Sequence, residues 1–365
     1  LEGAGSPVEV NLQHKDLTNL KLAKFLNANC VLVADIERGG VFAQIIGTIA
    51  LMQPQEKILI KGIIINRFRG DKALFKTGVT WIEKETGIPV LGILPWLKEI
   101  FPPEDSLDLL QRKKVHQSAE LEIAVIKLPR ISNFSDLDPF WNYSNIQMRW
   151  IEPEQELGNP DVLIIPGSKQ TIKDLEILRE TGMSKQINNY AKNGGTIFGI
   201  CGGLQMLGKS LEDPYQKENI NSRNSFSSDG LNLLPIKTTF GETKQTSQRE
   251  EIVAWPEKKR IKGFEMHYGE SDLIENENLD IISLFKNCSL GWVLERKDSS
   301  FIGGTYLHGI FENDDWRRQW INKIRQKKGL HNLNTNYENH INKREKLLDL
   351  LTDSFEEHIK LDKII

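Results

Sequence analysis

The sequence has few cysteines, and this scarcity limits the kinds of protein that it can encode. Cys30, Cys201 and Cys288 are the three cysteines in 365 residues, and their wide spacing fits neither a disulfide framework nor a cluster of metal ligands. The sequence also lacks an apolar run of the roughly 18 residues that a membrane span needs, and its first residues do not resemble a signal peptide. These absences predict a globular protein of the reducing cytoplasm, without a membrane partner.

The sequence also lacks an excess of charge of either sign. Lys and Arg number 47 against 50 Asp and Glu, which gives a formal net charge of −3. A chain so close to neutral offers no electrostatic reason to bind nucleic acid or an anionic membrane. Internal repeats and low-complexity segments are missing too. The length allows two domains with separate cores, and nothing in the pattern predicts an oligomeric state.

The chain opens on a turn-like stretch without an apolar strand before it. Its first residue is Leu1, followed by EGAGSP at 2–7. Because a glycine-rich turn of this kind normally follows a strand in an α/β fold, we expect a preceding strand in the complete polypeptide.

The first part of the chain alternates strand and helix patterns. Unbroken apolar runs rich in branched residues occupy 30–34, 62–65 and 90–94, and helical stretches at 42–51 and 75–86 lie between them. This alternation predicts a doubly wound α/β sheet, whose ligands bind at the carboxyl ends of the strands.

Polar side chains follow two of these strands. Asp35 and Arg38 come after the first, and Asn66 and Arg67 come after the second. Charged residues at two successive strand ends predict a single site for an anionic ligand together with a metal ion. Taken singly, each residue fits a helix cap or a loop ion pair equally well.

A second α/β unit follows a polar stretch. Residues 98–119 are charged and contain two adjacent prolines, which predicts a linker. Apolar runs at 121–128, 161–165 and 196–200 then resume the strand pattern. We therefore expect two doubly wound domains.

The predicted domain bounds are 1–115 and 120–330, followed by a helical tail over 331–365. In this tail apolar residues recur at every fourth position, as on one face of a helix that docks on the body of the protein; partner binding is the alternative. The stripe consists of Leu347, Leu351, Phe355 and Ile359.

A cysteine lies at a sharp strand-to-helix junction in TIFGICGGLQMLGKS, residues 196–210. The apolar run ends at Gly199-Ile200, and Cys201 is followed by two glycines and a helix-like segment. A nucleophile at such a turn is exposed near the positive end of a helix, which favours the reactive thiolate. The alternative is a small buried cysteine without a chemical role.

The same stretch matches the phosphate-loop pattern GxxxxGK[ST] at 203–210. A phosphate loop needs open backbone amides directly after a strand. Here the variable positions include Leu204, Met206 and Leu207, which are typical of the buried side of a helix already under way. We therefore interpret this match as a coincidence.

A cysteine nucleophile requires a base and an oxyanion pocket. His308 follows the apolar run 301–306 and precedes a glycine, which suits a base at a strand end; His267 is the second candidate. Backbone amides of the turn at 166–168 and of Gly202 are candidate oxyanion donors.

Several motifs together identify a family resemblance. PGSKQT at 166–171, GICGGLQMLG at 199–208, GFEMHYGES at 263–271 and GTYLHGIF at 304–311 resemble the class I glutamine amidotransferase domain of the cobalamin pathway. The first half resembles the carboxyl-terminal part of a dethiobiotin-synthetase-like, ATP-dependent amidoligase. The matching stretches are EGAGSP at 2–7, VADIERGGVFA at 33–43, GIIINRFRGD at 62–71 and PVLGILPW at 89–96. Both halves together resemble the cobyric acid synthase family.

This resemblance implies a glutamine-dependent ligase. In the family, the cysteine attacks the side-chain amide of glutamine to form a thioester, and the histidine moves protons so that ammonia is released. The ammonia then attacks a carboxylate that ATP has activated as an acyl phosphate. The acceptors implied are four side-chain carboxylates of the corrin adenosylcobyrinic acid a,c-diamide.

The resemblance also implies roles for individual residues. Cys201 is the nucleophile and His308 the base. ATP and Mg²⁺ act in the first half, with Glu2 as a magnesium ligand, and no bound prosthetic group is expected. The ligase side comprises Glu2, Asp35, Arg38, Asn66 and Arg67. The oxyanion and glutamine-binding set comprises Gly167, Gly202, Gly203, Gln205, Glu265 and His267.

The sequence departs from the family pattern at two places. Family members begin with a phosphate loop, which we expect upstream of Glu2 in a longer polypeptide. Many class I amidotransferases carry an acid two residues after the histidine, but that position is Ile310 here. This predicts a Cys–His dyad, with Glu312 or Glu265 as alternatives for an orienting acid.

Three other functions stay open from the sequence. One is a related amidating ligase, such as a cobyrinic acid a,c-diamide synthase or an enzyme that amidates a cell-wall precursor. Another is a non-catalytic module with the same fold, although it would have little reason to keep both Cys201 and His308. The third is a cysteine peptidase, which leaves the ATP-site-like first half unexplained.

Overall fold

The computed structural model describes residues 1–97, 119–218, 227–274, 280–286, 288–333, 339–360 and 362. Its contacts divide the chain into two compact units, and the chain leaves the first unit and later returns to it. The first unit comprises Leu1–Phe101 and Lys343–Ile365, and the second comprises Pro102–Asn342. The segment predicted as a separate tail is therefore divided between the two units. The predicted linker at 98–119 lies outside the described residues except at its last position.

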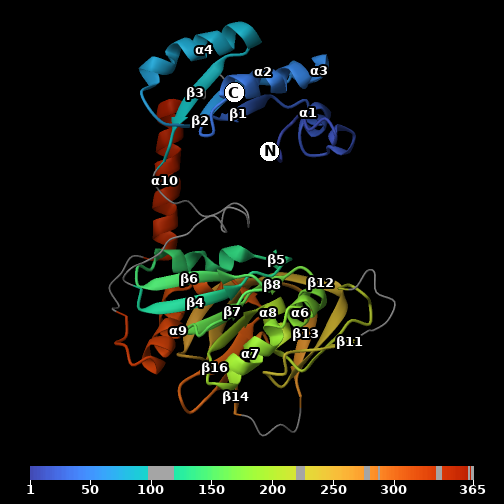
Figure 1. The fold of residues 1–365 in the computed structure, drawn as a ribbon, viewed down its shortest axis with the longest axis vertical. Helices are drawn as coiled ribbons and strands as arrows, with labels where there is room; N and C mark the ends of the chain where they lie inside the picture. Colours follow the sequence, from blue (N-terminus) through green and yellow to red (C-terminus); the bar gives the residue numbers. More distant parts are fainter. Residues whose placement is uncertain are drawn as a thin grey trace. The chain divides into compact units, whose positions relative to one another are not determined.

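The first unit is built on three parallel strands in the order β1-β2-β3 (Figure 1). These strands are Cys30–Asp35, Ile60–Phe68 and Val90–Pro95, close to the predicted apolar runs. Helices α2 (Val41–Leu51) and α4 (Lys72–Thr86) pack on one face of the sheet. Short helical segments complete the unit, namely η1 (Gln13–Lys15), α1 (Leu20–Leu26) and α3 (Pro54–Lys57). Alternate side chains of each strand point to α2 and α4, because strand side chains alternate between faces.

The C-terminal segment completes this sheet at its β3 edge. Helix α10 (His340–His358) buries none of its side chains. Ile359, directly after it, forms an antiparallel bridge with Gly92, and the Lys360 amide donates to the Leu91 carbonyl at 3.0 Å. Ile359 is 5% exposed and shares a small core with Ile64 and Leu91. The predicted stripe is thus anchored by its last member, while Phe355 stays 36% exposed.

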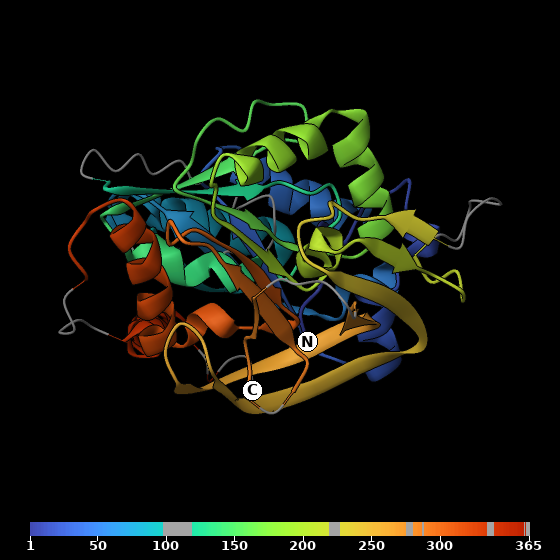
Figure 2. The ribbon, with the colours of Figure 1, turned by 90° about the horizontal axis from the view of Figure 1, so that it is seen from below.

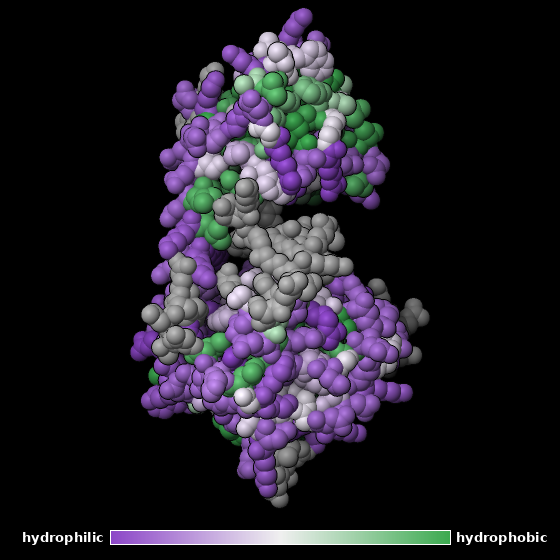
Figure 3. All heavy atoms as spheres, turned by 60° about the vertical axis from the view of Figure 1, so that its left-hand side comes forward, coloured by the Kyte–Doolittle hydropathy of each residue, from purple (hydrophilic) through white to green (hydrophobic). Residues whose placement is uncertain are grey.

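Figure 3 shows a group of hydrophobic residues on one face of the first unit. Within the described residues, large apolar side chains of this unit are unusually exposed. They include Leu17 at 78%, Phe25 at 84%, Val33 at 56%, Ile58 at 68% and Leu74 at 80%.

The second unit contains a seven-stranded sheet in the order β14-β15-β16-β9-β7-β4-β6. Five neighbouring strands, from β16 to β6, are parallel to one another; β15 runs antiparallel to β16, and β14 runs antiparallel to β15. The strands are β4 (Leu121–Ile126), β6 (Ile146–Ile151), β7 (Val162–Ile165), β9 (Ile197–Ile200), β14 (Ile281–Ser283), β15 (Gly291–Glu295) and β16 (Phe301–Thr305). This confirms the predicted α/β class.

Helices cover both faces of this sheet (Figures 1 and 2). Helices α6 (Thr171–Glu180), α7 (Met183–Lys192) and α8 (Gly202–Leu207) lie on one face, and α9 (Asp314–Lys327) and η2 (Phe134–Asn142) lie on the other. An aromatic cluster joins the second face to its helices: the Phe198 ring lies 5.7 Å from that of Trp320, and the Phe140 ring lies 4.7 Å from that of Phe311. None of the helices among the described residues is long and apolar enough to cross a membrane.

The second unit also contains a five-stranded sheet, in the order β11-β10-β12-β13-β17. Strands β12 (Ile236–Val253) and β13 (Lys259–Leu273) form a long twisted ribbon (Figure 2), and β13 also pairs with the short β17 (Leu307–His308). Strands β10 (Ser210–Glu212) and β11 (Ser227–Asp229) extend the sheet. The ribbon thereby reaches His308 from a distant part of the sequence.

We expect Ile359→Ala to loosen the first unit. Truncating a buried isoleucine costs about 2–4 kcal/mol, so amides of β2 and β3 should exchange hydrogen about 30-fold faster or more. Hydrogen–deuterium exchange of peptides from both units measures this. Leu348→Ala, at a position 44% exposed on the preceding helix α10, is the matched control. Equal exchange in the two variants would show that the C-terminal segment does not stabilise the sheet.

Candidate active site

Cys201 lies at a strained turn between β9 and α8. Its φ of 50° and ψ of −107° fall in a region that non-glycine residues rarely adopt. The Cys201 amide donates to the Thr305 carbonyl of β16 at 2.7 Å, which holds the turn against the sheet. A strained strand-to-helix turn of this kind projects a nucleophile at the carboxyl end of a parallel sheet.

Two glycines after the cysteine let α8 approach the sheet closely. A Cβ on Gly203 would lie 1.9 Å from the Ile165 carbonyl oxygen, so a larger residue cannot fit there. A Cβ on Gly202 would lie 2.9 Å from the Ser168 amide nitrogen. Gly202, directly after Cys201, therefore packs closely against the Ser168 amide. The turn at 166–168 and Gly202 are thus brought together.

The phosphate-loop pattern at 203–210 has the structure of a helix followed by a strand. Its first part lies in α8, and Leu204, Met206 and Leu207 are completely buried. Ser210 begins β10. The pattern forms no open loop, as the spacing of its apolar residues predicted.

His308 is completely buried and is held by a carboxylate from η2. Its Nδ1 lies 2.7 Å from Asp136 Oδ2, and the Gly309 amide donates to Asp136 Oδ1 at 2.7 Å. Strand β5 (Ile131–Ser132) pairs with β8 (Gly167–Ser168) just before η2, and this pairing fixes the path of the chain toward Asp136. The carboxylate thus binds both the imidazole and the backbone that carries it.

The imidazole also faces Cys201. Burial acts to lower the pKa of His308, but the hydrogen bonds and charges of Asp136 and Cys201 raise it to about 10 from an ordinary 6.5. The Cys201 side chain therefore lies close enough to His308 to raise the pKa of the imidazole. The Asn133 amide nitrogen lies 3.0 Å from His308 Nε2. Rotating that amide by 180° would present its oxygen instead, so Asn133 can pair with either protonation state.

Asp136 was not predicted from the sequence, which favoured a Cys–His dyad. The structure differs because the carboxylate in contact with His308 precedes it by 172 residues, and only the fold brings the two together. Its position in the loop after β4, a carboxyl strand end of a parallel sheet, was the available signal. Glu265, one of the two alternatives, is paired with Arg249 at 2.6 Å.

Gln205 belongs to a buried polar network beneath Cys201. Thr171 Oγ1 donates to Gln205 Oε1 at 3.1 Å, and Gln205 Nε2 donates to the Tyr306 hydroxyl at 3.3 Å. That hydroxyl lies 2.6 Å from Ser271 Oγ. These contacts connect α6, α8 and β13. The side chain of Gln205 is 2% exposed and already has protein partners at both ends.

Glu265 and His267 lie on the same face of β13, on either side of Met266. The Met266 carbonyl oxygen lies 3.7 Å from Cys201 Sγ. Glu265 Oε1 accepts hydrogen bonds from Ser247 and Arg249. The His267 ring packs on Tyr306 with a centroid distance of 4.1 Å. Both predicted residues therefore border the cysteine turn.

The polar segment after β10 also contributes buried groups. Asp213 accepts the Glu218 amide at 2.8 Å, and the Glu218 carboxylate accepts the Ile172 amide at the start of α6. Burial raises the pKa of Glu218 to about 7, with neighbouring Asp213 and Asp174 acting in the same direction. Acidic residues in a polar stretch are usually solvated, so the sequence gives no sign of this burial.

Three of the residues predicted for the ligase site lie together at the carboxyl edge of the first unit's sheet. Asp35 and Asn66 are register partners at the ends of β1 and β2. Arg67 Nη1 lies 3.2 Å from Asp35 Oδ2, and the Arg67 amide donates to Asn66 Oδ1 at 2.8 Å. Arg67 has a left-handed φ of 60°, which turns the chain sharply at this edge.

Three further residues at this edge were not predicted. Arg69 pairs with Glu37 at 2.8 Å, and its guanidinium lies 3.9 Å from the centre of the Trp96 ring. Arg67 lies 5.3 Å from the same ring. Trp96 follows β3, so the ends of all three strands meet here. A pair of guanidinium groups on an aromatic ring is suited to anionic ligands.

Glu2 and Arg38 are not part of this cluster in the described chain. Both side chains are exposed, and no contact joins either of them to Asp35. The described residues contain no group of three or more His, Cys, Asp or Glu side chains that could hold a metal ion. Mg²⁺ typically needs one or two carboxylates together with phosphate oxygens. Asp35 fits that limited role, and Glu2 does not fit it here.

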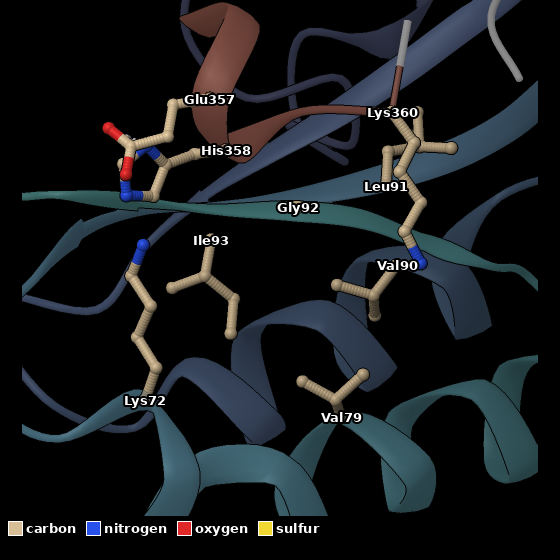
Figure 4. A pocket seen from close by; sticks show the side chains of 9 residues that line it. All are labelled: Lys72, Val79, Val90, Leu91, Gly92, Ile93, Glu357, His358 and Lys360. Atoms are coloured by element: carbon tan, nitrogen blue, oxygen red, sulfur yellow. Dashed lines mark ion pairs between the residues drawn. The ribbon is translucent and has the colours of Figure 1, made fainter. Parts of the chain in front are cut away.

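A separate pocket of about 290 Å³ lies in the first unit between β3, α4 and the end of α10 (Figure 4). Val79, Val90 and Ile93 form an apolar lining, and Lys72 and Lys360 lie at its margins. Burial lowers the pKa of Lys72, and the nearby charge of Glu357 opposes this. None of the predicted site residues lines this pocket.

Comparison with known proteins gives matches over both parts of the chain. Residues 122–316 match the CobB/CobQ-like glutamine amidotransferase domain, and residues 1–104 match an AAA domain. A cobyric acid synthase of Prochlorococcus marinus strain NATL1A is 80% identical over 365 residues, which is 100% of this chain and 74% of that protein. Another, from Prochlorococcus marinus strain MIT 9313, is 55% identical, and the match spans 100% of this chain and 73% of that protein.

Solved structures give more distant likenesses. A crystal structure of a glutamine amidotransferase has a TM-score of 0.41 at 14% identity, covering 57% of this chain and 99% of that one. PurLQS from Thermotoga maritima has a TM-score of 0.38 at 13% identity, covering 57% and 96% respectively. Scores this low carry no argument about the site.

The raised pKa of His308 predicts a pH-dependent contribution to stability. This contribution is complete below the unfolded value near 6.5 and is lost as the pH rises through about 10. NMR titration of the ring should give a midpoint near 10, and Asp136→Asn should lower it. Urea unfolding across this range should show the pH-dependent stability decline at lower pH in the variant. An unshifted midpoint in the variant would contradict control by Asp136.

Proposed function

The chain belongs to the cobyric acid synthase family, and on that premise we propose that it amidates corrin side-chain carboxylates with ammonia taken from glutamine. It is an amidating ligase by this membership. The reaction proposed is conversion of adenosylcobyrinic acid a,c-diamide to adenosylcobyric acid, as the names of the relatives suggest. The observation that carries the glutaminase half is the convergence of Cys201, His308 and Asp136.

In the proposed glutaminase reaction, the thiol proton of Cys201 passes to His308 as Sγ attacks the side-chain amide carbon of glutamine. The sulfur–carbon bond forms, and the carbonyl oxygen becomes an oxyanion. His308 then delivers a proton to the amide nitrogen, the carbon–nitrogen bond breaks, and ammonia leaves a thioester. His308 next takes a proton from water, which attacks the thioester and releases glutamate and the thiol.

Asp136 has a positioning role in this proposal. Its hydrogen bond to Nδ1 keeps Nε2 directed at the sulfur and stabilises the imidazolium during proton transfer. Because Asp136 Oδ1 also accepts the Gly309 amide, the carboxylate orients the main chain as well as the ring. The dyad expected from the sequence thereby becomes a triad.

The oxyanion is proposed to bind backbone amides beside Cys201. The close approach of Gly202 to the Ser168 amide supports this assignment. A Cβ on Gly167 would lie 2.8 Å from Ser132 Oγ and 3.4 Å from the His308 ring. Glycine at this position therefore lets the turn at 166–168 lie close to both groups. We assign Gly203 to the packing of α8, and Gln205 to the network that fixes α8 against α6 and β13.

The ligase reaction is proposed for the first unit, where the AAA-domain match supports the use of ATP. ATP supplies the activation of the acceptor carboxylate as an acyl phosphate. We propose that Asp35 is a ligand of Mg²⁺, and that Arg67 and Asn66 bind anionic groups at the strand ends. The ion pair between Arg67 and Asp35 supports this, because it keeps a cation and an anion at one edge.

We expect Cys201→Ala to abolish glutamine hydrolysis, with a loss of at least about a thousandfold, because the thioester can no longer form. Ammonium chloride should still support amidation if the two reactions use separate sites. Glutamate formation and amide formation are assayed in parallel. Cys288→Ala is the control, since burial raises the pKa of that thiol to about 11 and makes it a poor nucleophile. Unchanged glutamate formation in Cys201→Ala would overturn the assignment.

We expect Asp136→Asn to lower the kcat of glutamine hydrolysis by about a hundredfold to ten-thousandfold, with a small change in KM. The physical reason is loss of the carboxylate that fixes the tautomer of His308. Glu312→Gln, which changes the acid considered from the sequence, should keep most of the activity. A larger effect at Glu312 than at Asp136 would favour the other acid as the orienting group.

A further inference from the structure

Asn133 contacts the nitrogen of His308 that exchanges protons in the proposed reaction. Because Asp136 Oδ2 lies 2.7 Å from Nδ1, one proton stays on Nδ1, and Nε2 is the atom that gains and loses a proton. The side-chain amide of Asn133 lies 3.0 Å from Nε2. Asn133 was not predicted from the sequence, and the orienting role of Asp136 does not explain its contact.

The backbone of Asn133 directs its side chain to His308. Asn133 directly precedes η2 with a φ of 47° and a ψ of 44°, a left-handed conformation that asparagine adopts more readily than most residues. An asparagine at this position commonly caps the helix, but the Asn133 side chain makes no capping hydrogen bond. Its main-chain carbonyl accepts the Asp136 amide at 3.0 Å. A single turn therefore supplies a partner to each nitrogen of the imidazole.

The imidazole is held in place beside Asn133. His308 is completely buried, and the Phe264 ring stacks on it with a centroid distance of 5.2 Å and an interplanar angle of 23°. A Cβ on Gly167 would lie 3.4 Å from His308 Cε1, so the main chain closes another side of the ring. Because Asp136 holds Nδ1 as well, Nε2 stays beside Asn133 when its proton arrives or leaves.

A carboxamide suits an atom whose protonation state changes. Its oxygen can accept from a protonated Nε2, and after rotation its nitrogen can donate to an unprotonated one. Burial acts to lower the pKa of His308, but Asp136 and Cys201 raise it to about 10, which favours the imidazolium near neutral pH. Once Sγ bonds to the glutamine carbon, the sulfur is no longer an anionic acceptor. The Nε2 proton then needs another acceptor, and the Asn133 oxygen lies within reach.

We propose that Asn133 is a further catalytic residue, whose Oδ1 accepts the Nε2–H of the His308 imidazolium after Sγ has bonded to the glutamine carbon. This rests on the proposed glutaminase function. The proton stays on Nε2 until the glutamine amide nitrogen takes it; the Nε2–H bond then breaks, a new N–H bond forms, and ammonia leaves. Because Oδ1 is neutral, it holds the proton less strongly than a carboxylate would, and transfer to the leaving nitrogen stays fast.

Asn133→Gly in the full-length enzyme tests this role, because glycine adopts the left-handed turn without strain and removes only the side chain. We expect the kcat of glutamine hydrolysis to fall about tenfold or more, with KM almost unchanged. The NMR titration midpoint of His308 should fall by about one pH unit, the effect of losing a hydrogen bond to a charged group. Asn232→Gly is the matched control, since Asn232 has a φ of 56° in the same unit and is exposed.

Asn133→Asp provides a second variant, since aspartate also tolerates the left-handed conformation. A carboxylate beside Nε2 should raise the His308 midpoint, because it favours the imidazolium, and should lower kcat, because it retains the proton. A His308 midpoint in Asn133→Gly equal to that of the control would overturn the proposal, and so would a shifted midpoint with unchanged kcat. Absence of glutamate formation by the unmodified enzyme would instead overturn the proposed glutaminase function, an outcome on which the His308 midpoints do not depend.

Discussion

The close approach of α8 to β7 controls the geometry of the whole second unit's site. Gly203 faces the Ile165 carbonyl at a distance that excludes any side chain, and Gly199 faces the backbone of Gly203 in the same way. Without this contact the chain could not turn from β9 into α8 within one residue, and Cys201 would not be forced into its strained conformation. The strain at Cys201 is maintained by the parallel strands on either side, which hold β9 in the centre of the sheet.

Around this turn, the second unit brings together groups from four distant segments. The loop after β4 supplies Asp136, the turn after β7 supplies backbone amides, β9 and α8 carry the cysteine, and β17 carries His308. A parallel sheet places all of these at the carboxyl ends of its strands. The β12–β13 ribbon closes the remaining side and contributes Glu265 and His267. Its buried polar groups connect to α8 through Tyr306 and Gln205, so the ribbon is part of the site's rigid frame.

In the first unit, too, the candidate site residues lie at the carboxyl ends of parallel strands. Asp35, Asn66 and Arg67 meet where β1 and β2 end, and Trp96 after β3 adds an aromatic surface for Arg69. The return of the C-terminal segment was the main unexpected feature. The stripe of apolar residues in α10 predicted a docked helix, but the decisive contact is made by Ile359 alone, through a bridge to Gly92 at the β3 edge. Helical periodicity could not reveal that the segment after the helix would act as a strand partner.

The sequence by itself determined the α/β class, most strand positions and the cysteine turn, and its motifs singled out Cys201 and His308. These follow from local signals: apolar runs, glycines at a turn and motifs of fixed spacing. The tertiary structure decided which acid serves His308 and which polar residues are buried. Asp136 is 172 residues from His308, and the burial of Glu265 and His267 is decided by what packs against β13. Such partnerships depend on strand order and on burial, which are set by long-range packing that no local pattern encodes.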